Sequence, residues 1–466
     1  MKIRNKIKSN TWKSVFYSFG QISNITAYQS FILLIFTFYY TIVNINIWSI
    51  TLGYSIWSVW NAFNDPMIGY FSDKTHTRWG RRLPYIIFSF IPLSIILVLL
   101  YTPPISFGIS SELINFIYFF LIIIIFELFY TAYSLNMTSL FPEVFLTEEE
   151  RTQANNIRQV FTIIGLIFAI ILPGLIISDY SDPASIPQYQ EFGIIAGIIV
   201  SIGVVLFLLF GPREREEFKQ DYKKAFGFFG TIKHCFKSKS FRYYVISECC
   251  NWFVFGMLPT IVPLYAKYVL NVSDALLTSL LLGLTFISAT IFMTILWKPV
   301  VRKIGNRKAW IISMSIWIIT LIPLFFINNL ISGMIVFFLI GMGLSGSFFI
   351  IDLVVADIVD EDETVTGMRR EAGYYGVNAF VLRFSNAFVI LAIGSVFSTV
   401  GWLTFEPSAV TADVILGLRI LICVFPSIAL IIAVLAIYKY PLHGERLKQV
   451  KSKLQEIHDK KRAEVR

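Results

Sequence analysis

The sequence predicts an all-α membrane protein with twelve transmembrane helices in two pseudo-symmetric six-helix bundles. The chain of 466 residues is 56% hydrophobic and 16% aromatic, and its mean hydropathy is +0.68. Ordinary globular domains are roughly 45 to 50% apolar. Apolar segments of about 20 residues, the length that crosses a bilayer as a helix, recur along the chain. The longest charged interruption, Gly211 to Arg242, leaves equal numbers of segments on its two sides.

The predicted spans and the loops between them suggest an internal repeat. Basic residues cluster around a Gly after the second span of each half, and acidic then basic residues follow the fourth. This echo predicts a duplicated six-helix unit, typical of secondary transporters that bind substrate between their halves. The spans cover 15–43, 46–71, 84–101, 112–141, 156–178, 192–210, 241–268, 273–298, 308–328, 331–356, 373–400 and 413–439. The corresponding domains are an N-terminal bundle (1–210), a cytoplasmic linker (211–240), a C-terminal bundle (241–440) and a cytoplasmic tail (441–466).

Basic residues mark one side of the membrane. The N-terminal tail and every second loop are rich in Lys and Arg, whereas the alternate loops contain only Lys267. Because positively charged loops resist translocation, we expect both termini in the cytoplasm and a multi-pass protein of the cell (plasma) membrane. The net charge of +9 then reflects topology. We expect membrane lipids, not nucleic acid, to be the partners of these residues.

Asp65 lies within the second predicted span, roughly 9 Å from its cytoplasmic end at 1.5 Å per residue. A buried charge there costs at least about 2.5 to 3.5 kcal/mol on insertion scales. Asn61 precedes it by one helical turn and shares its face, and Pro66 frees a backbone carbonyl one turn back. These oxygens are suited to binding Na⁺ or a proton. The alternative is an ion pair that locks two helices together.

Other charged residues inside the predicted spans are open to more than one interpretation. Glu127 shares a helical face with Ser134 and is either a proton carrier or a structural partner of Arg158 or Asn24. Arg383, near the middle of its span, is expected to contact substrate or a counter-ion. Structural roles are expected for three other groups, Glu248, Asp352 and Arg419.

The basic cluster after the second span has a possible mechanical role. Asp73 with Arg78, Arg81 and Arg82 could form charge-assisted bonds across helix ends, and thus a conformational latch. Topology alone also explains these charges. All four histidines fall in predicted cytoplasmic segments and the four cysteines lack metal-ligand spacing. We therefore expect no enzymatic activity, no cofactor and no metal other than Na⁺ at Asp65.

Three stretches of the sequence resemble a known family. "NDPMIGYFSDKTHTRWGRRLPY" is similar to the signature after the second helix of the glycoside-pentoside-hexuronide:cation symporters, the melibiose-carrier group of the major facilitator superfamily. "SLFPEV" and "RREAGYYGVNAFVLRFSNAF" resemble later segments of the same family. The resemblance implies a major facilitator fold and cation-coupled symport of a sugar, glycoside or sugar acid by alternating access. The related lysolipid transporters of animals share the signature.

The resemblance also implies roles for single residues. Asp65 matches the second carboxylate of the family's cation site, while its other two acids fall on Asn61 and Ser134. Arg383 matches the basic residue that links cation and sugar sites, and Arg158 lies within one residue of a sugar-contacting Arg. The helix-one acid falls at Ile25, beside Asn24. With one of three cation carboxylates kept, H⁺ on Asp65 or Glu127 and Na⁺ both remain open as coupling ions.

The expected function is therefore cation-coupled secondary active transport of a small, sugar-like molecule by a monomer. Two alternatives stay open: a lysolipid or amphipathic-solute transporter of the same fold, and a non-transporting membrane receptor or scaffold. The candidate substrate-binding residues are Asn24, Asn136, Arg158, Trp252 and Arg383, and the candidate cation-binding residues are Asp65, Asn61, Ser134 and Glu127.

Overall fold

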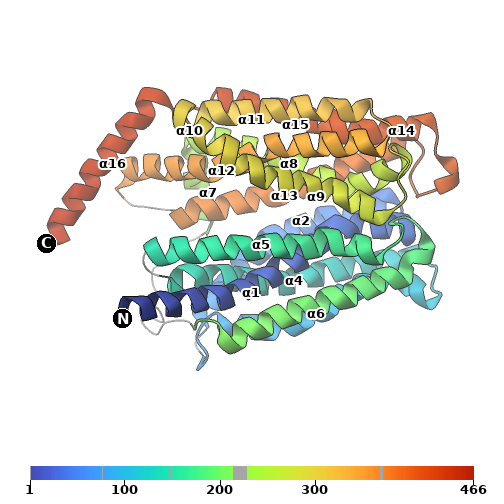
Figure 1. The fold of residues 1–466 in the computed structure, drawn as a ribbon, viewed down its shortest axis with the longest axis horizontal. Coiled ribbons are helices and arrows are strands. Elements are labelled where there is room, and N and C mark those ends of the chain that lie inside the picture. Colours follow the sequence, from blue (N-terminus) through green and yellow to red (C-terminus); the bar gives the residue numbers. More distant parts are fainter. Residues whose placement is uncertain (1, 76, 146–147, 214–227, 368–370, 466) are drawn as a thin grey trace. The chain divides into compact units, whose positions relative to one another are not determined.

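The computed structural model describes residues 2–75, 77–145, 148–213, 228–367 and 371–465 as helices joined by short loops (Figure 1). Within these ranges, 10 helical segments are long and apolar enough to cross a membrane. Helices α2 (Ile47–Lys74), of 28 residues, and α3 (Leu83–Leu99), of 17, account for the other two predicted spans. The predicted all-α, twelve-span membrane architecture is confirmed.

Packing divides the chain into two compact units. Unit 1 comprises Met1–Ala225, Val272–Leu280 and Gly401–Ala409, and unit 2 comprises Phe226–Asn271, Leu281–Val400 and Val410–Arg466. Each unit thus contains the helices of one predicted half. Unit 1 also takes two short segments from the second half of the sequence.

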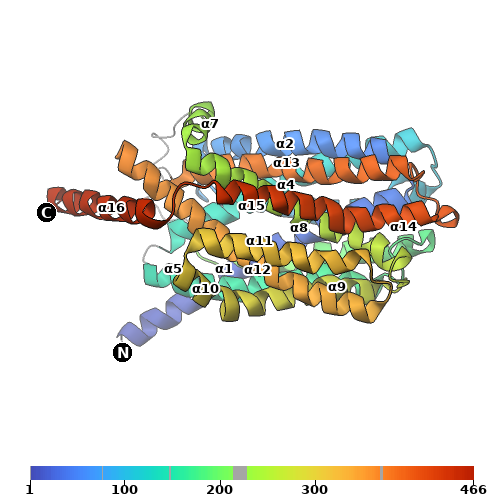
Figure 2. The same cartoon turned by 90° about the horizontal axis from the view of Figure 1, so that it is seen from above.

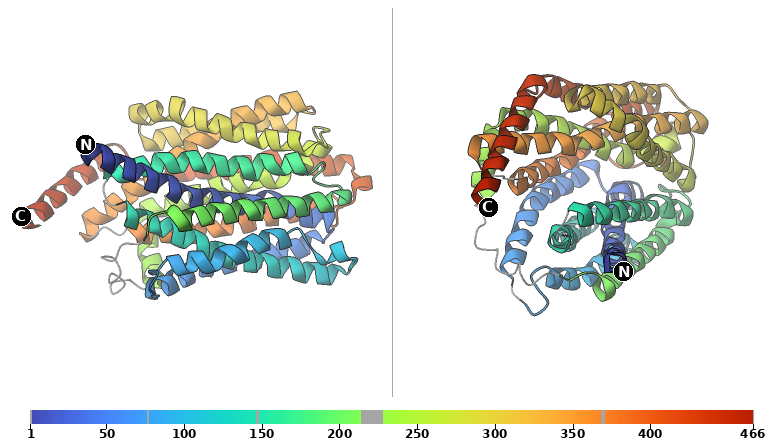
Figure 3. Two further views of the ribbon diagram at one scale, coloured as in Figure 1. Left: turned by 60° about the horizontal axis from the view of Figure 1, so that its bottom comes forward. Right: turned by 60° about the vertical axis from the view of Figure 1, so that its left-hand side comes forward.

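In unit 1, α1 packs against α5 and α6, and α4 packs against α2 and α3 (Figures 1 and 3). Small residues permit the close approaches, because a Cβ on Gly203 of α6 would lie 2.8 Å from the Phe19 carbonyl oxygen of α1. The elements are α1 (Lys2–Thr37), the π-helical turn η1 (Phe38–Ile42), α2, α3, η2 (Pro104–Phe107), α4 (Glu112–Val144), α5 (Glu148–Ile176), η3 (Pro183–Ser185) and α6 (Ile186–Phe210).

The segment Gly401–Ala409 is held to the rest of unit 1 by backbone and side-chain hydrogen bonds. The Tyr40 hydroxyl donates to the Trp402 carbonyl at 2.6 Å, and the Ile47 amide donates to the Leu403 carbonyl at 2.8 Å. The Phe405 amide donates to Asn44 Oδ1 at 3.0 Å. The Trp402 side chain is fully buried as a result. Hydropathy and loop charge carry no information about this association.

In unit 2, α12 packs against α11, and α8 packs against α15 and α13. Its elements are α7 (Phe228–Lys237), α8 (Lys239–Tyr268), α9 (Ala275–Phe292, whose first residues belong to unit 1), the π-helical turn η6 (Met293–Trp297), α10 (Lys298–Ile304), α11 (Asn306–Leu321), η7 (Ile322–Phe325), α12 (Leu330–Thr366), α13 (Glu371–Thr399), α14 (Ala412–Arg419), the π-helical turn η9 (Ile420–Val424), α15 (Phe425–Tyr438) and α16 (Gly444–Val465), with η8 (Pro407–Ala409) in unit 1.

Several helices extend beyond the predicted spans because polar residues continue a helix that hydropathy ends, as at the starts of α1 (Lys2) and α5 (Glu148). The sixth span starts at Ile186, before residue 192, where the Asp182 side chain accepts from Ala184 N and Pro187 occupies the first turn. The tenth span continues through its acidic end to Thr366, beyond residue 356. It stops at Gly367, whose φ of +71° places it in the left-handed region that glycine adopts without strain.

The C-terminal tail contains a helix, α16, bound to the acidic end of α12 (Figure 2). Lys451 Nζ lies 2.7 Å from both Asp357 Oδ1 and Asp360 Oδ2, and Arg446 Nη2 lies 2.6 Å from Glu361 Oε1. Partial burial acts to lower the pKa of Lys451, but hydrogen bonds to the two aspartates outweigh it and raise that pKa above its ordinary value. The tail thus pairs two basic residues with three acids at the end of α12.

Replacing Arg446 and Lys451 together by Ala is expected to release α16 from α12. Each pair is partly exposed, so the loss in global stability is small, about 0.2 to 1 kcal/mol per pair. Hydrogen exchange of the α16 amides, followed by mass spectrometry, should rise sharply while α11 exchanges as before. Lys448→Ala is the matched control, because its partner Glu445 lies on α16 itself. Unchanged α16 protection in the double variant would show that other contacts hold the helix.

Candidate functional site

The predicted cation residue Asp65 is joined to Glu127 through one hydroxyl group. Thr131 Oγ1 of α4 lies 3.0 Å from Asp65 Oδ1 of α2 and 3.3 Å from Glu127 Oε1, one turn earlier on its own helix. Glu127 is fully buried, and Asp65 is half-buried. Two carboxyl groups that are distant in sequence therefore form one site in unit 1. Thr131 was not among the residues that sequence analysis selected, since a lone Thr in an apolar span carries no signal.

Amide and carbonyl groups of α2 extend this oxygen-rich site. Asn64 Nδ2 donates to the backbone carbonyl of Glu127 at 3.1 Å, which fixes α2 against α4. Asn61 is fully buried, and neither its Oδ1 nor its Nδ2 has a hydrogen-bond partner among the described residues. Pro66 lies inside α2 and cannot donate to the carbonyl of Ala62. Buried polar groups normally have partners, so the hydrogen-bonding capacity of Asn61 is unused by the described residues.

The Thr131 hydroxyl imposes a condition on the two acids. It carries one hydrogen and can donate to one carboxylate at a time. Its contact with the second carboxyl group is favourable if that group carries a proton, or if a cation lies beside both. Two like charges this close are costly in a low-dielectric environment. The geometry is therefore suited to holding one positive charge, either H⁺ or a monovalent cation.

The remaining predicted residues of unit 1 lie in different directions. Ser134 is half-buried and shares the Glu127 face of α4, two turns further along. Asn136 is fully buried but lies half a turn round the helix from Glu127, so it faces away from the carboxyl pair. Asn24, 7% exposed, has an Oδ1 without a partner in the described part of the chain. One turn later, Tyr28 stacks on Tyr130 of α4 with ring centroids 4.9 Å apart.

Arg158 of α5 is held by neighbours other than Glu127. Its Nη2 donates to Asn155 Oδ1 at 2.8 Å, and its guanidinium lies 4.7 Å from the centroid of the Phe141 ring. For Glu127, whose structural partner was expected to be Arg158 or Asn24, the structure describes a hydrogen bond from Thr131.

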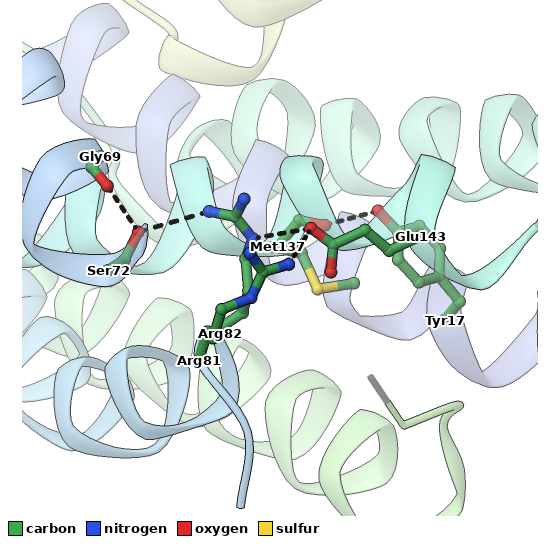
Figure 4. A network of polar contacts seen from close by, with 7 residues as sticks. All are labelled: Tyr17, Gly69, Ser72, Arg81, Arg82, Met137 and Glu143. Carbon is green, nitrogen blue, oxygen red and sulfur yellow. Dashed lines mark hydrogen bonds and ion pairs between the residues drawn. The ribbon is translucent and has the colours of Figure 1, made fainter. Parts of the chain in front are cut away.

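Two arginines of the predicted latch, Arg81 and Arg82, form ion pairs with an acid at the end of α4 (Figure 4). Arg81 Nη2 and Arg82 Nε each lie 3.2 Å from Glu143 Oε1 at the end of α4, and Arg82 Nη1 donates to Ser72 Oγ at 3.3 Å. The Asp73 side chain lies outside the described residues. Arg78 is exposed, with its guanidinium 5.0 Å from the Trp79 ring centroid, and takes no part in these contacts.

Replacing Glu143 by Gln is expected to destabilise unit 1. The Arg81 and Glu143 side chains are 6% and 14% exposed, and removing one partner of a buried pair costs about 3 to 5 kcal/mol because a charge is left uncompensated. A clearly lower melting temperature of the purified protein would be the measurement. Glu191→Gln, on the exposed surface of α6, should melt like the parent. Equal melting of the two variants would contradict a structural role for these ion pairs.

The unit 2 residues Trp252 and Arg383 lie on α8 and α13, which pack together. Cys249 Sγ of α8 lies 3.2 Å from Ser385 Oγ of α13. One turn beyond Arg383, Asn386 Oδ1 approaches Gly256 of α8, where a Cβ would lie 3.2 Å from it. The half-buried Trp252 ring lies 5.7 Å from the Phe348 ring of α12.

Arg419 has the structural role expected of it. Its Nη1 donates to the Phe325 carbonyl at 2.6 Å, and its Nη2 reaches Asn328 Oδ1. These bonds satisfy a carbonyl at the end of η7, where the helix has no further amides to supply.

The sequence and fold can be compared with those of known proteins. The isoprimeverose transporter of Lactiplantibacillus pentosus is 24% identical over 349 residues, 73% of this chain and 70% of that protein. The sodium-dependent lysophosphatidylcholine symporter 1 of Xenopus tropicalis is 23% identical over 440 residues, 87% of this chain and 82% of that protein. The solved structure of the nucleoside transporter NupG has the same fold, with a TM-score of 0.65 at 14% identity over 92% of this chain and 99% of that one. Residues 16–444 match the family described as MFS/sugar transport protein, and the chain therefore belongs to that family of membrane transporters.

Proposed function

We propose that this protein is a symporter that couples the entry of H⁺ or Na⁺ at Asp65 to the uptake of a sugar, glycoside or sugar acid. The observation that carries the proposal is the Asp65–Thr131–Glu127 arrangement, in which one hydroxyl hydrogen is shared between two carboxyl groups. A cation bound there would interact with both carboxyl groups. The cation changes the charge of the site by one unit. This change in charge couples cation binding to the conformational equilibrium of the transporter.

The nature of the substrate is supported by the relatives. The isoprimeverose transporter is named for a sugar, and the matched family is described by sugar transport. Ser134 and Tyr130 lie on α4 with Glu127, and Tyr28, one turn after Asn24 on α1, stacks on Tyr130; these residues supply polar groups and aromatic faces for a sugar. Transport needs no covalent chemistry, so no cofactor other than the coupling ion is part of the proposal.

The proposal includes the setting of the protein. Basic residues in the N-terminal tail and in every second loop support a cell-membrane location with both termini in the cytoplasm. These basic residues would face anionic lipids. Each unit contains its own share of the candidate residues, so a monomer is sufficient for the cycle.

A lysolipid is the second candidate substrate, and it rests on one observation. The lysophosphatidylcholine symporter is similar to this chain over a larger share of both proteins than the isoprimeverose transporter. A lipid substrate would use the same coupling site with a different binding surface.

The test is stabilisation of the purified protein by ions and candidate substrates. Melting is measured with Na⁺ replaced by K⁺, at pH 5.5 to 8, and with neutral sugars, sugar acids or lysophosphatidylcholine added. Stabilisation by a sugar that grows with Na⁺ or with falling pH would support the proposal and identify the ion. Stabilisation by lysophosphatidylcholine and by no sugar would replace the sugar with the lipid. Insensitivity to every ion and substrate would overturn symport.

A further inference from the structure

One helix, α9, takes part in both units. Its first residues belong to Val272–Leu280, which packs in unit 1, whereas the chain from Leu281 onward packs in unit 2. Alternating access moves one bundle of a transporter against the other. A continuous helix cannot follow two bundles that move apart, so either α9 breaks or its contact with unit 1 opens.

Glycine permits the contact of α9 with α5. A Cβ on Gly174 of α5 would lie 2.7 Å from Leu276 Cα and 2.8 Å from the Ala275 carbonyl oxygen. Both are backbone atoms, which cannot rotate away as the end of a side chain can. Any larger residue at position 174 would therefore push the start of α9 away from α5.

Hydrogen bonds fasten the same contact and can be exchanged for bonds to water. The hydroxyl groups of Tyr180 and Ser279 lie 2.6 Å apart, and the Ala275 amide donates to the Ser178 carbonyl at 3.1 Å. Amides in the first turn of a helix have no acceptor within it, so the Ala275 amide can change partners while α9 stays intact. Opening the contact therefore costs less than breaking the helix.

The backbone is suited to a hinge at the point where each segment enters unit 1. Asn271, the last residue of unit 2 before Val272, has a φ of +59°, and Gly401, the first residue of Gly401–Ala409, has a φ of +82°. Glycine adopts this left-handed region readily, and Asn more easily than most other residues. Hinges are a few residues at the ends of elements that absorb large changes in φ and ψ.

We propose that Val272–Leu280 and Gly401–Ala409 together form the extracellular gate of this transporter. Neither segment contains Lys or Arg, in keeping with the predicted extracellular side. The segments pack in unit 1 while the gate is closed and leave it when the gate opens, turning at Asn271 and Gly401. Gly174 is the positioning residue that allows the gate to close. The inference rests on membership of the transporter family and is independent of the ion and the substrate.

The experiment measures how fast a water-soluble maleimide reacts at position 279 of the full-length protein in nanodiscs. Ser279→Cys changes a side chain that is 3% exposed, so the thiol reacts while the gate is open. Peptide mass spectrometry counts the label at this position alone. Adding Gly174→Ala should speed the reaction roughly 5- to 150-fold, because overpacking disfavours the closed state. Gly376→Ala, whose Cβ would meet nothing within 4 Å, should leave the rate unchanged.

A second reporter distinguishes a gate from local fraying of α9. Phe405→Cys places a thiol at a buried position of the other segment, which Gly174 does not touch. If the two segments open together, Gly174→Ala should also speed labelling at position 405. A higher rate at position 279 with an unchanged rate at position 405 would overturn the common gate.

A variant without added bulk and an internal control guard against misfolding. Tyr180→Phe removes the hydroxyl that contacts residue 279 and should raise the labelling rate there roughly two- to tenfold. Cys235, 1% exposed in unit 2, should stay unlabelled in every variant that remains folded. Parent-like rates in both Gly174→Ala and Tyr180→Phe would overturn the gate. Labelling needs neither ion nor substrate, so a failure of the proposed symport to appear in uptake assays would leave this result standing.

Discussion

Replacing Asp65 by Asn is expected to abolish concentrative uptake while leaving exchange of substrate across the membrane. Asn keeps the size of the side chain and an oxygen for the Thr131 hydroxyl, which lies 3.0 Å from Asp65 Oδ1. It cannot gain or lose the charge on which coupling depends. A potential of 100 mV acting on one cation is worth about 2.3 kcal/mol, or roughly 50-fold accumulation of an uncharged substrate. The variant should instead equilibrate its substrate to a ratio of about one.

The measurement is accumulation of labelled substrate in proteoliposomes under an imposed ion gradient, with counterflow as the exchange assay. Glu127→Gln, measured in parallel, identifies which acid carries the coupling charge. If Glu127→Gln loses accumulation and Asp65→Asn does not, the charge resides on Glu127. If both variants accumulate like the parent, the carboxyl pair is structural and coupling occurs elsewhere.

Replacing Gly343 by Ala is expected to destabilise unit 2, although it adds one methyl group. A Cβ at this position of α12 would lie 2.4 Å from Trp317 Cβ and 2.5 Å from Trp317 Cα on α11. Real Cβ atoms do not approach so closely, and Trp317 is fully buried with no room to move. Overpacking of this kind costs about 1 to 3 kcal/mol. The two helices must separate, and the melting temperature should fall.

Gly376 on α13 provides the matched control, because a Cβ there would meet nothing within 4 Å. Ala is a better helix former than Gly by about 0.5 to 1 kcal/mol. Gly376→Ala should therefore melt at the parent temperature or slightly above it. If Gly343→Ala melted no lower than Gly376→Ala, the close packing of α11 and α12 would not be required for stability.

Most of the fold follows from properties that each segment carries in itself. Twelve apolar stretches determine twelve membrane helices, because backbone groups in a bilayer must be satisfied within the segment. Errors occur where polar residues extend a helix, as at Ile186 and Thr366, since hydropathy detects the membrane and not the helix end. Hydropathy also misses the tail helix α16, because ion pairs with α12 stabilise it.

The candidate sites were likewise predictable from the sequence only in part. Asp65 is recognisable from the sequence because a charge in a membrane span is rare and costly. Its connection to Glu127 is not, because it depends on Thr131, whose importance follows from distance alone. Likewise, the ion pairs of Arg81 and Arg82 with Glu143 are not recognisable from the sequence, because only folding brings Glu143 close.

The sequence by itself determined that this chain is a multi-pass helical membrane protein, where its spans lie and which of them contain an acid. Those properties are local, since they depend on the transfer of each segment from water to lipid. Tertiary structure decided which acids share a hydroxyl and which segments of the second half of the sequence pack in unit 1. Hydrogen bonds and close packing act over a few ångströms between residues far apart in the chain, and only the folded protein sets those distances.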